Sequence, residues 1–471
     1  MSKKVVPPVS PLLKSVEILK KRCETIHIKK LRFPNYRNIE LGSTIDFEFP
    51  ITILLGPNGT NKSSVLHALY GSVARNTMAD FWFETEIDAI PATINNVKQS
   101  VTHSYLDSEN NLVESIKARA PRKSADPDYW EPVKPSQVYG FTSGATRVPP
   151  IQLKVTHLDL RGELPAFDKY FYFPDKKHIA GLAQYAKKRK TLRRDYRKQD
   201  YLRQRSPFLK KQMSANGTTL TPKELKIISY ILEQNYIDCR ILHHDIYHGH
   251  EGWTLIFKTK HIKSYSEAFA GSGESAIALI VHKVLNAPDK SLILFDEPET
   301  SLHPRAQQRL LEFLAEQSVH KSLQMVMATH SIYLAKNLPN SAIRVMEMGS
   351  NGRVSISTDY SADEALHEIG TFPAGKTVIV EDIRAKKIVL GSLEKIAPQT
   401  LKEFHIQVRP GGTSRIYKDI QAYANSGNND IFVLFDGDQR PTEEIPRSGE
   451  LPQGKRELEA IIQQITSGLN S

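Results

Sequence analysis

S-L-I-L-F-D-E-P-E-T-S-L-H-P, residues 291–304, is the stretch that decides the expected fold. Four apolar residues, 292–295, run directly into Asp296 and Glu297, and a polar turn follows them. A buried strand over 292–295 would place both carboxylates at its carboxyl end, where open parallel α/β sheets bind their ligands. Two carboxylates after an apolar run also occur as an ordinary helix N-cap. The other motifs of the chain are therefore needed to distinguish a catalytic pair from a cap.

Residues 25–72 predict a phosphate-binding loop. We expect strands over residues 26–33 and 45–55, the second ending in the apolar run I-T-I-L-L. A glycine-containing loop, a Lys-Ser pair and a helical pattern follow, which is the context that identifies a P-loop. Backbone N–H groups would hold the phosphates of ATP, Lys62 would reach the β- and γ-oxygens, and Ser63 would ligate Mg²⁺. The candidate nucleotide-binding residues of this loop are Gly56, Asn58, Gly59, Asn61, Lys62, Ser63 and Ser64.

Asn61 stands at a position where such loops usually carry a glycine. Asparagine adopts the left-handed backbone conformation more readily than most residues, so we expect the loop to form despite this change. Short motifs also match by chance. The flanking strand and helix, together with the carboxylates Asp296 and Glu297, argue against a chance match here.

Three further motifs surround the carboxylate pair. Ala270-Gly271-Ser272-Gly273-Glu274 opens an apolar helix, Ser301-Leu302-His303-Pro304 follows the carboxylates, and the strand M-V-M-A ends in Thr329-His330-Ser331. Taken alone, a small-residue loop at a helix start is a cap, and a histidine after a strand is more often structural. In this order the motifs resemble those of ABC-type ATPases, such as the heads of RecF, SMC proteins and OLD-family nucleases, over about residues 25–345.

The ABC-type resemblance implies a role for each motif. Asp296 would hold Mg²⁺ through water, Glu297 would orient the attacking water, and His330 would sense the γ-phosphate. The signature residues Ser272, Gly273 and Glu274 would contact the γ-phosphate bound by another protomer, which implies a homodimer or larger homo-oligomer with ATP sandwiched between heads. A transporter cassette would need a membrane domain, of which the sequence has no trace.

The composition is that of a soluble multidomain protein. A chain of 471 residues exceeds one compact core and predicts about two to four domains. Its hydrophobic content of 40% and charged content of 24% are ordinary. Cys23 and Cys239 are distant and unpatterned, which argues against a disulfide framework or a cysteine metal site. With no membrane-length apolar run and no signal-peptide core, we expect a cytoplasmic protein without membrane contact.

The net charge of +11 comes almost entirely from one segment. Residues 187–211 hold twelve Lys or Arg against two Asp, which leaves 51 basic and 50 acidic residues elsewhere. We expect a basic helix over 185–212, with Tyr185, Tyr196 and Tyr201 among its charges, inserted in the head as part of a lobe over about 160–240. Phosphate contact with some base stacking would make it a DNA-binding arm, whereas the alternative is a solvated helix. The candidate nucleic-acid-binding residues are Lys187, Lys188, Arg189, Lys190, Arg193, Arg194, Arg197 and Lys198.

The C-terminal residues predict a second, smaller α/β domain. After a hairpin over 342–358, the strand T-V-I-V ends at Glu381-Asp382, the strand F-H-I-Q-V-R-P runs into Gly411-Gly412, and I-F-V-L-F ends at Asp436-Gly437-Asp438. Strands alternating with helices indicate a small parallel sheet with carboxylates at one edge, although Asp-Gly-Asp is also a common turn sequence. The pattern resembles a TOPRIM domain. It implies that Glu381, Asp436 and Asp438 bind Mg²⁺ or Mn²⁺ and catalyse phosphodiester cleavage.

An ABC-type head followed directly by a TOPRIM-like domain resembles the OLD (overcoming lysogenization defect) family, which includes Gabija-type and retron-associated anti-phage nucleases. The resemblance spans about residues 25–440 and implies an ATP-regulated DNA nuclease of bacterial defence. A retron reverse transcriptase with its DNA fits the family as a partner. OLD nucleases carry further acidic and lysine residues after the Asp-x-Asp, whereas only 33 residues follow Asp438 here, with Lys455, Glu457 and Glu459 as the nearby substitutes.

The expected fold class is α/β, with an ABC-type ATPase head that carries an inserted helical, basic arm, followed by a small TOPRIM-like α/β domain. The expected boundaries are an N-terminal extension over 1–24, the head over 25–371 and the TOPRIM-like domain over 372–471. Two other functions stay open at this point. One is a non-cleaving ATP-dependent sensor or scaffold whose degenerate TOPRIM domain recruits a partner, and the other is a RecF-type repair ATPase.

Overall fold

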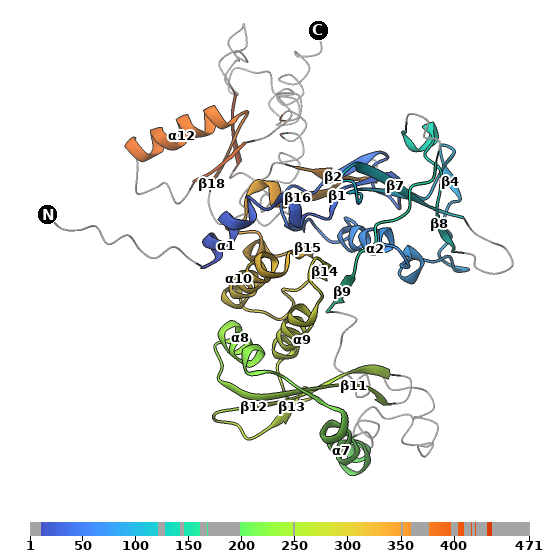
Figure 1. The fold of residues 1–471 in the computed structure, drawn as a ribbon. Helices are drawn as coiled ribbons and strands as arrows, with labels where there is room; N and C mark the ends of the chain where they lie inside the picture. The colour runs from blue at the N-terminus through green and yellow to red at the C-terminus, as the bar shows by residue number, and fades with distance from the viewer. Residues whose placement is uncertain are drawn as a thin grey trace, which may run out of the picture. The chain divides into compact units, whose positions relative to one another are not determined.

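The chain forms two compact units, residues 1–365 and residues 366–471. The computed structural model, drawn in Figure 1, describes residues 11–120, 128–141, 146–160, 167, 198–247, 250–349, 352–358, 376–396, 404–408, 416, 420 and 431–435. Among these residues, no helix is long and apolar enough to cross a membrane.

A six-stranded sheet forms the centre of the first unit, with the order β17-β16-β3-β15-β14-β9. Its strands are β17 (Val354–Ser357), β16 (Ile343–Met348), β3 (Ile51–Leu55), β15 (Gln324–Thr329), β14 (Leu292–Asp296) and β9 (Val155–Asp159). All neighbours pair in parallel except β16 and β17, which form the hairpin expected over 342–358. Every residue of β3, β14 and β15 is buried, as expected for parallel strands covered on both faces.

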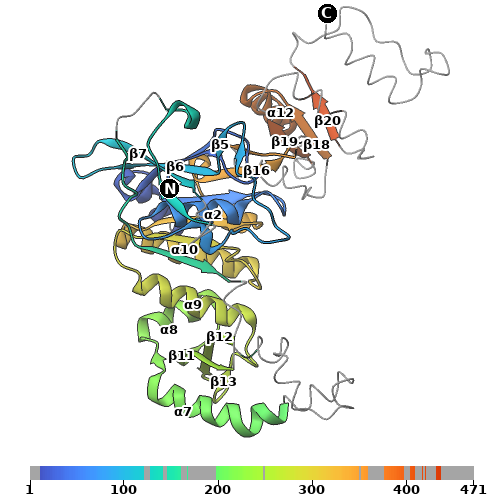
Figure 2. The same ribbon diagram turned by 90° about the vertical axis from the view of Figure 1, so that its right-hand side faces the viewer.

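Helices cover this sheet on both sides. The helix α2 (Lys62–Ser72) packs its Val65, Leu66 and Leu69 against apolar residues of β3, β14 and β15. Figures 1 and 2 show α9 (Ser272–Asn286) and α10 (Pro304–Lys321) on the side of the sheet away from α2. The helix α1 (Pro11–Leu19) packs on α10, so part of the expected N-terminal extension belongs to the core of the head.

The single strand expected over 45–55 is wrong, because the chain divides it between two sheets. The strand β2 (Ser43–Asp46) belongs to a five-stranded antiparallel sheet, while β3 belongs to the central sheet. Pro50 lies between them and has no N–H group with which to continue a ladder, so the chain changes sheets there. The antiparallel sheet has the order β2-β1-β6-β7-β8, and its other strands are β1 (Ile28–Asn35), β6 (Ser100–Leu106), β7 (Leu112–Arg119) and β8 (Trp130–Pro132).

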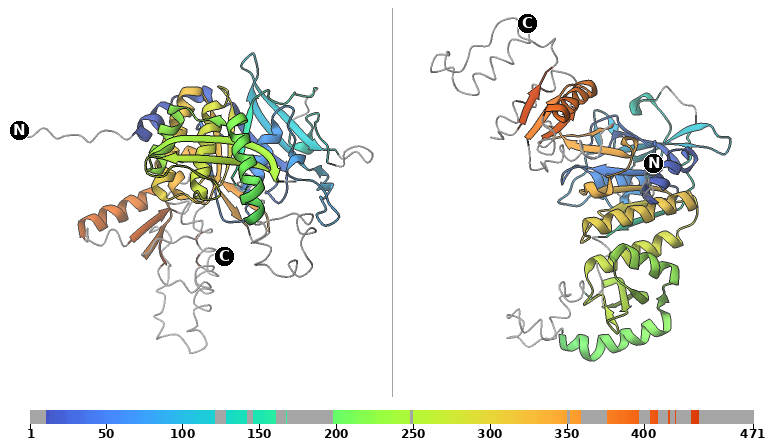
Figure 3. Two further views of the ribbon diagram at one scale, coloured as in Figure 1. Left: turned by 90° about the horizontal axis from the view of Figure 1, so that it is seen from below. Right: turned by 90° about the vertical axis from the view of Figure 1, so that its left-hand side faces the viewer.

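A lobe follows β9 in the chain. It contains a four-stranded sheet of β10 (Thr218–Thr219), β11 (Tyr236–Tyr247), β12 (His250–Thr259) and β13 (Tyr265–Ser266), with the helices α7 (Ser206–Asn216) and α8 (Pro222–Leu232). This sheet runs to residue 266, past the end expected near 240, because β12 pairs along β11 and β13 pairs with β12. Figure 3 shows α7 lying beside the strands of this sheet. Residues 185–197 of the expected basic helix lie outside the described residues.

The second unit contains a three-stranded parallel sheet with the order β19-β18-β20. Its elements are β18 (Lys376–Val380), α12 (Ile383–Ile396), β19 (Phe404–Val408) and β20 (Ile431–Leu434). Val380, Ile406 and Val408 form its buried core, against which Leu390 and Leu393 of α12 pack. The expected residues that lie outside the described part of this unit are Gly411, Gly412, Asp436, Asp438, Lys455, Glu457 and Glu459.

Candidate nucleotide-binding site

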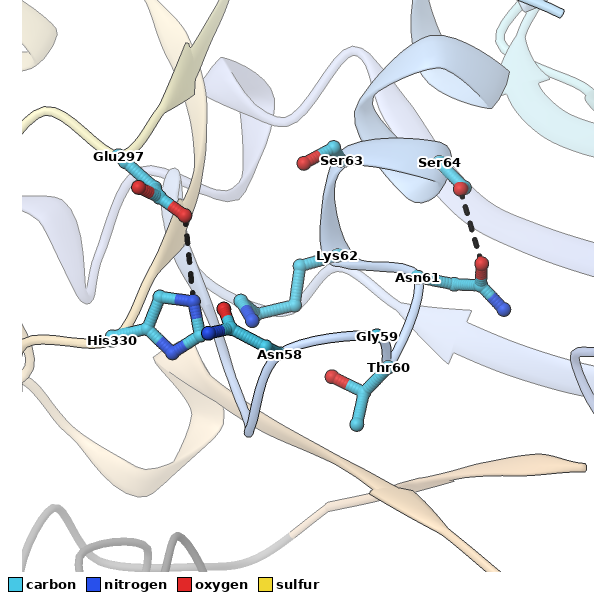
Figure 4. A pocket seen from close by; sticks show the side chains of 9 residues that line it. All are labelled: Asn58, Gly59, Thr60, Asn61, Lys62, Ser63, Ser64, Glu297 and His330. Carbon is cyan, nitrogen blue, oxygen red and sulfur yellow. Dashed lines mark hydrogen bonds and ion pairs between the residues drawn. The ribbon is translucent and has the colours of Figure 1, made fainter. Parts of the chain in front are cut away.

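One pocket of the head, with a volume of about 200 Å³, brings together three separate motifs of the sequence. Because β3, β15 and β14 are parallel neighbours, the segments that follow them meet at one edge of the sheet. Figure 4 shows the P-loop on one side of the pocket and the residues after β14 and β15 on the other. The lining residues are Asn58, Gly59, Thr60, Asn61, Lys62, Ser63, Ser64, Glu297 and His330.

The P-loop has the backbone conformation that phosphate binding requires. Gly59 has a φ of +82°, and Asn61 has φ 64° and ψ 22°, so asparagine occupies the left-handed position expected for it. A Cβ atom at Gly56 would overlap the carbonyl oxygen of Met346 on β16, which excludes any larger residue there. The helix α2 begins at Lys62, so its first N–H groups face the pocket and favour an anion.

The ammonium group of Lys62 lies at the base of this loop. Its Nζ donates hydrogen bonds to the carbonyl oxygens of Gly56 and Pro57, both at 2.9 Å. The side chain is buried, and Figure 4 shows it directed back across the loop towards Asn58 and His330. Ser64 Oγ donates to Asn61 Oδ1 at 3.2 Å, so its hydroxyl is held within the loop. Lys62 is therefore positioned to interact with phosphate oxygens that enter the pocket.

Glu297 and His330 face the P-loop from the opposite wall. His330 Nε2 lies 3.4 Å from Glu297 Oε1, the contact drawn as a dashed line beside Lys62 in Figure 4. Glu297 has a φ of +50°, a conformation that is costly for a residue with a side chain. Its N–H donates to Ala328 O at 2.8 Å, and the N–H of His330 donates to Glu299 Oε1 at 2.8 Å. The structure thus brings together the two residues expected to orient water and sense phosphate.

Asp296 and Ser63 are suited to a magnesium ion. Asp296 is the last residue of β14 and is only 7% exposed. Side chains alternate along a strand, so Asp296 projects to the same face as Leu294, which packs in the cluster that includes α2. Ser63 lies in the first turn of α2, on that side of the sheet. A carboxylate and a hydroxyl oxygen are the hard ligands that Mg²⁺ takes beside phosphate oxygens and water.

The signature residues lie away from this pocket. Gly273 and Glu274 line a second pocket of about 260 Å³ together with Ser301, Leu302 and other residues of the segment after β14. A Cβ atom on Gly273 would lie 2.7 Å from Ser301 O and 3.1 Å from Leu302 Cδ2, so the two loops pack as closely as glycine permits. Ser272, the first residue of α9, is exposed.

Glu274 holds the conformation of the signature loop. Its carboxylate accepts hydrogen bonds from Gly271 N at 2.7 Å and from two tyrosine hydroxyls, those of Tyr236 at 2.5 Å and Tyr265 at 2.7 Å. Burial, reinforced by this carboxylate, raises the pKa of both tyrosines, so both hydroxyls remain protonated donors. Both tyrosines come from the sheet of the lobe, and no short motif pointed to them.

Two other residues near the site were not identified from the sequence. Asp159, the last residue of β9, pairs in parallel register with Asp296. Asn38, in the loop between β1 and β2, accepts a hydrogen bond from Asn61 of the P-loop. Neither position belongs to a local motif.

The remaining candidate residues are only partly described. Glu381 follows β18, and Asp382 Oδ1 accepts a hydrogen bond from Ala385 N at 2.7 Å, which caps the start of α12. Of the eight basic residues expected to bind nucleic acid, Lys198 is described, and it is exposed. In the described parts of the chain, no group of three or more His, Cys, Asp or Glu side chains could hold a metal ion.

Comparison with known proteins identifies a family whose model matches this chain. The family model described as "AAA domain, putative AbiEii toxin, Type IV TA system" matches residues 51–336, from β3 to just past His330. No curated protein matches the chain. The "SMC head domain from Thermotoga maritima" is 14% identical with a TM-score of 0.37, over 70% of this chain and 98% of that one. The Smc head domain bound to the C-terminal domain of ScpA, derived from Pyrococcus furiosus, is 14% identical with a TM-score of 0.41, over 73% and 98%.

Proposed function

The chain belongs to the family described as AAA domain, putative AbiEii toxin, Type IV TA system, and we propose that it uses ATP to regulate a metal-dependent nuclease. The ABC-type ATPase head is the established part of this function. The proposal adds three steps: closure of a head dimer on ATP, cleavage of DNA by a C-terminal TOPRIM-like domain, and a role in anti-phage defence.

The pocket residues define how ATP would be hydrolysed. The P-loop N–H groups and the start of α2 bind the phosphates, and Lys62 exchanges its contacts with Gly56 and Pro57 for phosphate oxygens. Ser63 and Asp296 would hold Mg²⁺, which supplies charge stabilisation at the β- and γ-phosphates. Glu297 orients the attacking water and accepts its proton, while His330, 3.4 Å away, fixes the carboxylate and faces the γ-phosphate position.

The separation of the two pockets supports a dimer. In one chain Lys62 and Glu297 line the first pocket, whereas Gly273 and Glu274 line the second. An exposed helix start at Ser272 offers N–H groups and a positive dipole to a phosphate brought by another copy. A homodimer, or a larger assembly built from it, would complete each ATP site.

The order of strands in the second unit supports the nuclease. The register pairs Val380 of β18 with Leu434 of β20, so the residues that follow these two strands start from the same sheet edge. Glu381 directly follows β18, and Asp436 and Asp438 come soon after β20 in the sequence. Carboxylate oxygens suit Mg²⁺ or Mn²⁺, which would activate water for phosphodiester cleavage. The OLD resemblance extends this proposal to DNA, with the basic segment around Lys198 as an additional contact and a retron reverse transcriptase with its DNA as a fitting partner.

The second candidate function is a non-cleaving ATP-dependent sensor or scaffold. Such a protein would use a degenerate TOPRIM domain to recruit a partner.

The observation that carries the proposal is the meeting of Lys62, Glu297 and His330 in one pocket. The test is incubation of purified protein with plasmid DNA and Mg²⁺ or Mn²⁺, with and without ATP. We expect cutting that depends on ATP and disappears in Glu381→Ala and Asp436→Ala. Cutting that survives both substitutions would exclude the TOPRIM site, and absence of cutting with intact ATP turnover would favour the scaffold.

A further inference from the structure

The loop between β1 and β2 touches the P-loop at the residue where glycine is usual. Asn61 Nδ2 donates a hydrogen bond to Asn38 Oδ1 at 2.5 Å, in a partly buried position. This contact joins residues that are 23 positions apart in the chain. Asn38 does not line the nucleotide pocket, but it is bonded to Asn61, which does.

Asn61 needs support that a glycine would not need. Its φ of 64° lies in the left-handed region, where a residue with a Cβ atom is strained relative to glycine. The side-chain amide of Asn61 is held at both ends, since Nδ2 donates to Asn38 and Oδ1 accepts from Ser64 Oγ at 3.2 Å. These two bonds fix the amide and oppose its rotation into the space above the helix start. The strained loop conformation is thereby retained without a glycine.

Asn38 is itself firmly held by the β16–β17 hairpin. Its Nδ2 donates to Gly352 O at 3.0 Å, and its backbone carbonyl accepts from Val354 N at 2.8 Å. Two residues later, Glu40 N donates to Val354 O at 2.8 Å. The same hairpin strand, β16, also contacts the P-loop directly through Met346 and Gly56. Asn38 thus joins the loop between β1 and β2 to the β16–β17 hairpin, both of which border the P-loop, and it has little freedom to move.

We propose that Asn38 is a positioning residue for ATP binding, which acts by holding Asn61 in the left-handed conformation that the P-loop requires. It does not touch the nucleotide. Its contribution depends on the presence of asparagine at position 61, because a glycine there would adopt the same backbone conformation without a side-chain partner. The proposal concerns binding of ATP by one chain and so holds whether or not the head dimer and the nuclease are correct.

A double-mutant cycle tests this dependence. The dissociation constant of Mg-ATP is measured by calorimetry for the full chain, for Asn38→Ala, for Asn61→Gly and for the double variant. Loss of one hydrogen bond predicts about two- to tenfold weaker binding when Asn38→Ala is made alone. In the Asn61→Gly background the same substitution should change the constant by less than about 1.5-fold, since the bond that it removes is already absent. Glu40→Ala, an exposed residue of the same loop, is the matched control and should leave binding unchanged.

Thermal melting separates this role from a merely structural one. Asn38→Ala also removes the bond to Gly352, so its melting temperature should fall in both backgrounds, whereas the loss of ATP affinity should appear only when Asn61 is present. Equal losses of affinity in both backgrounds would overturn the proposal, as would wild-type affinity in Asn38→Ala. If ATP failed to bind the unaltered chain at all, the ATPase site itself would be in error.

Discussion

Substitution of Gly273 by alanine should separate the signature loop from the segment after β14. A Cβ atom there would lie 2.7 Å from the backbone oxygen of Ser301, whereas ordinary contacts begin at 3.4 Å, so the two loops must move apart by about 0.7 Å. Ser301 cannot yield easily, because it already has a φ of +62° and its neighbour Leu302 donates its N–H to Glu299 O and accepts from Gln307 Nε2, both at 2.9 Å.

The size of the effect follows from this geometry. Overpacking of this kind costs about 1–3 kcal/mol. With an unfolding entropy of about 2.1 cal/mol/K per residue over the 365 residues of the first unit, the melting temperature should fall by about 1–4 °C. A displacement of nearly 1 Å at a catalytic site lowers turnover by about 10- to 100-fold, while ATP binding at the P-loop should be retained.

Thermal melting and phosphate release from ATP are the assays for Gly273→Ala. Ser272→Ala is the matched control, since Ser272 is exposed and adjacent, and its melting temperature should equal that of the wild type. Reduced turnover in the control without loss of stability would indicate a direct contact with phosphate. Unchanged melting and unchanged turnover in Gly273→Ala would refute the close packing of the two loops.

Three further predictions follow from buried polar groups. Lys117 Nζ donates to the carbonyl oxygens of Gly71, Val73 and Asn76 at the end of α2. Lys117→Met should therefore lower the free energy of unfolding by about 3 kcal/mol in urea denaturation. Wild-type stability of this variant would contradict a stabilising role for these three hydrogen bonds. Burial lowers the pKa of His67 and of His103 from 6.5 to about 3, so the unfolded chain binds more protons below pH 6.5, and stability should fall by about 4 kcal/mol for the pair by pH 5. The free energy of unfolding should depend less on pH in His103→Gln. A wild-type free energy of unfolding that does not change with pH would exclude neutral buried histidines. The double substitution Tyr236→Phe and Tyr265→Phe should lower ATP turnover about tenfold or more, with ATP binding retained. Unchanged turnover would show that Glu274 needs neither hydroxyl to hold the signature loop.

The parts of the site that follow single strands could be predicted from the sequence. The runs I-T-I-L-L and L-I-L-F are buried parallel strands, and the residues after them, Lys62 and Glu297, meet because parallel neighbours share a carboxyl edge. The left-handed position of Asn61 was also predictable, since the phosphate loop requires that conformation and asparagine tolerates it.

Other parts depend on contacts between distant segments. The apolar pattern of residues 45–55 reads as one strand, and only pairing with two different partners divides it at Pro50. The strand β9 has no motif of its own, and its register beside β14 brings Asp159 next to Asp296. The hydrogen bonds of Tyr236 and Asn38 likewise join residues far apart in the chain, and no local periodicity encodes such a pair.

We expect ATP to be hydrolysed in the pocket formed by Lys62, Glu297 and His330. Phosphate release from Mg-ATP by the wild type and by Glu297→Gln tests this, with ATP binding measured on the same samples. We expect both proteins to bind ATP and the variant to turn it over at least about 100-fold more slowly, because the amide cannot accept a proton from water. Wild-type turnover by a Glu297→Gln variant that binds ATP normally would contradict the assignment of this site.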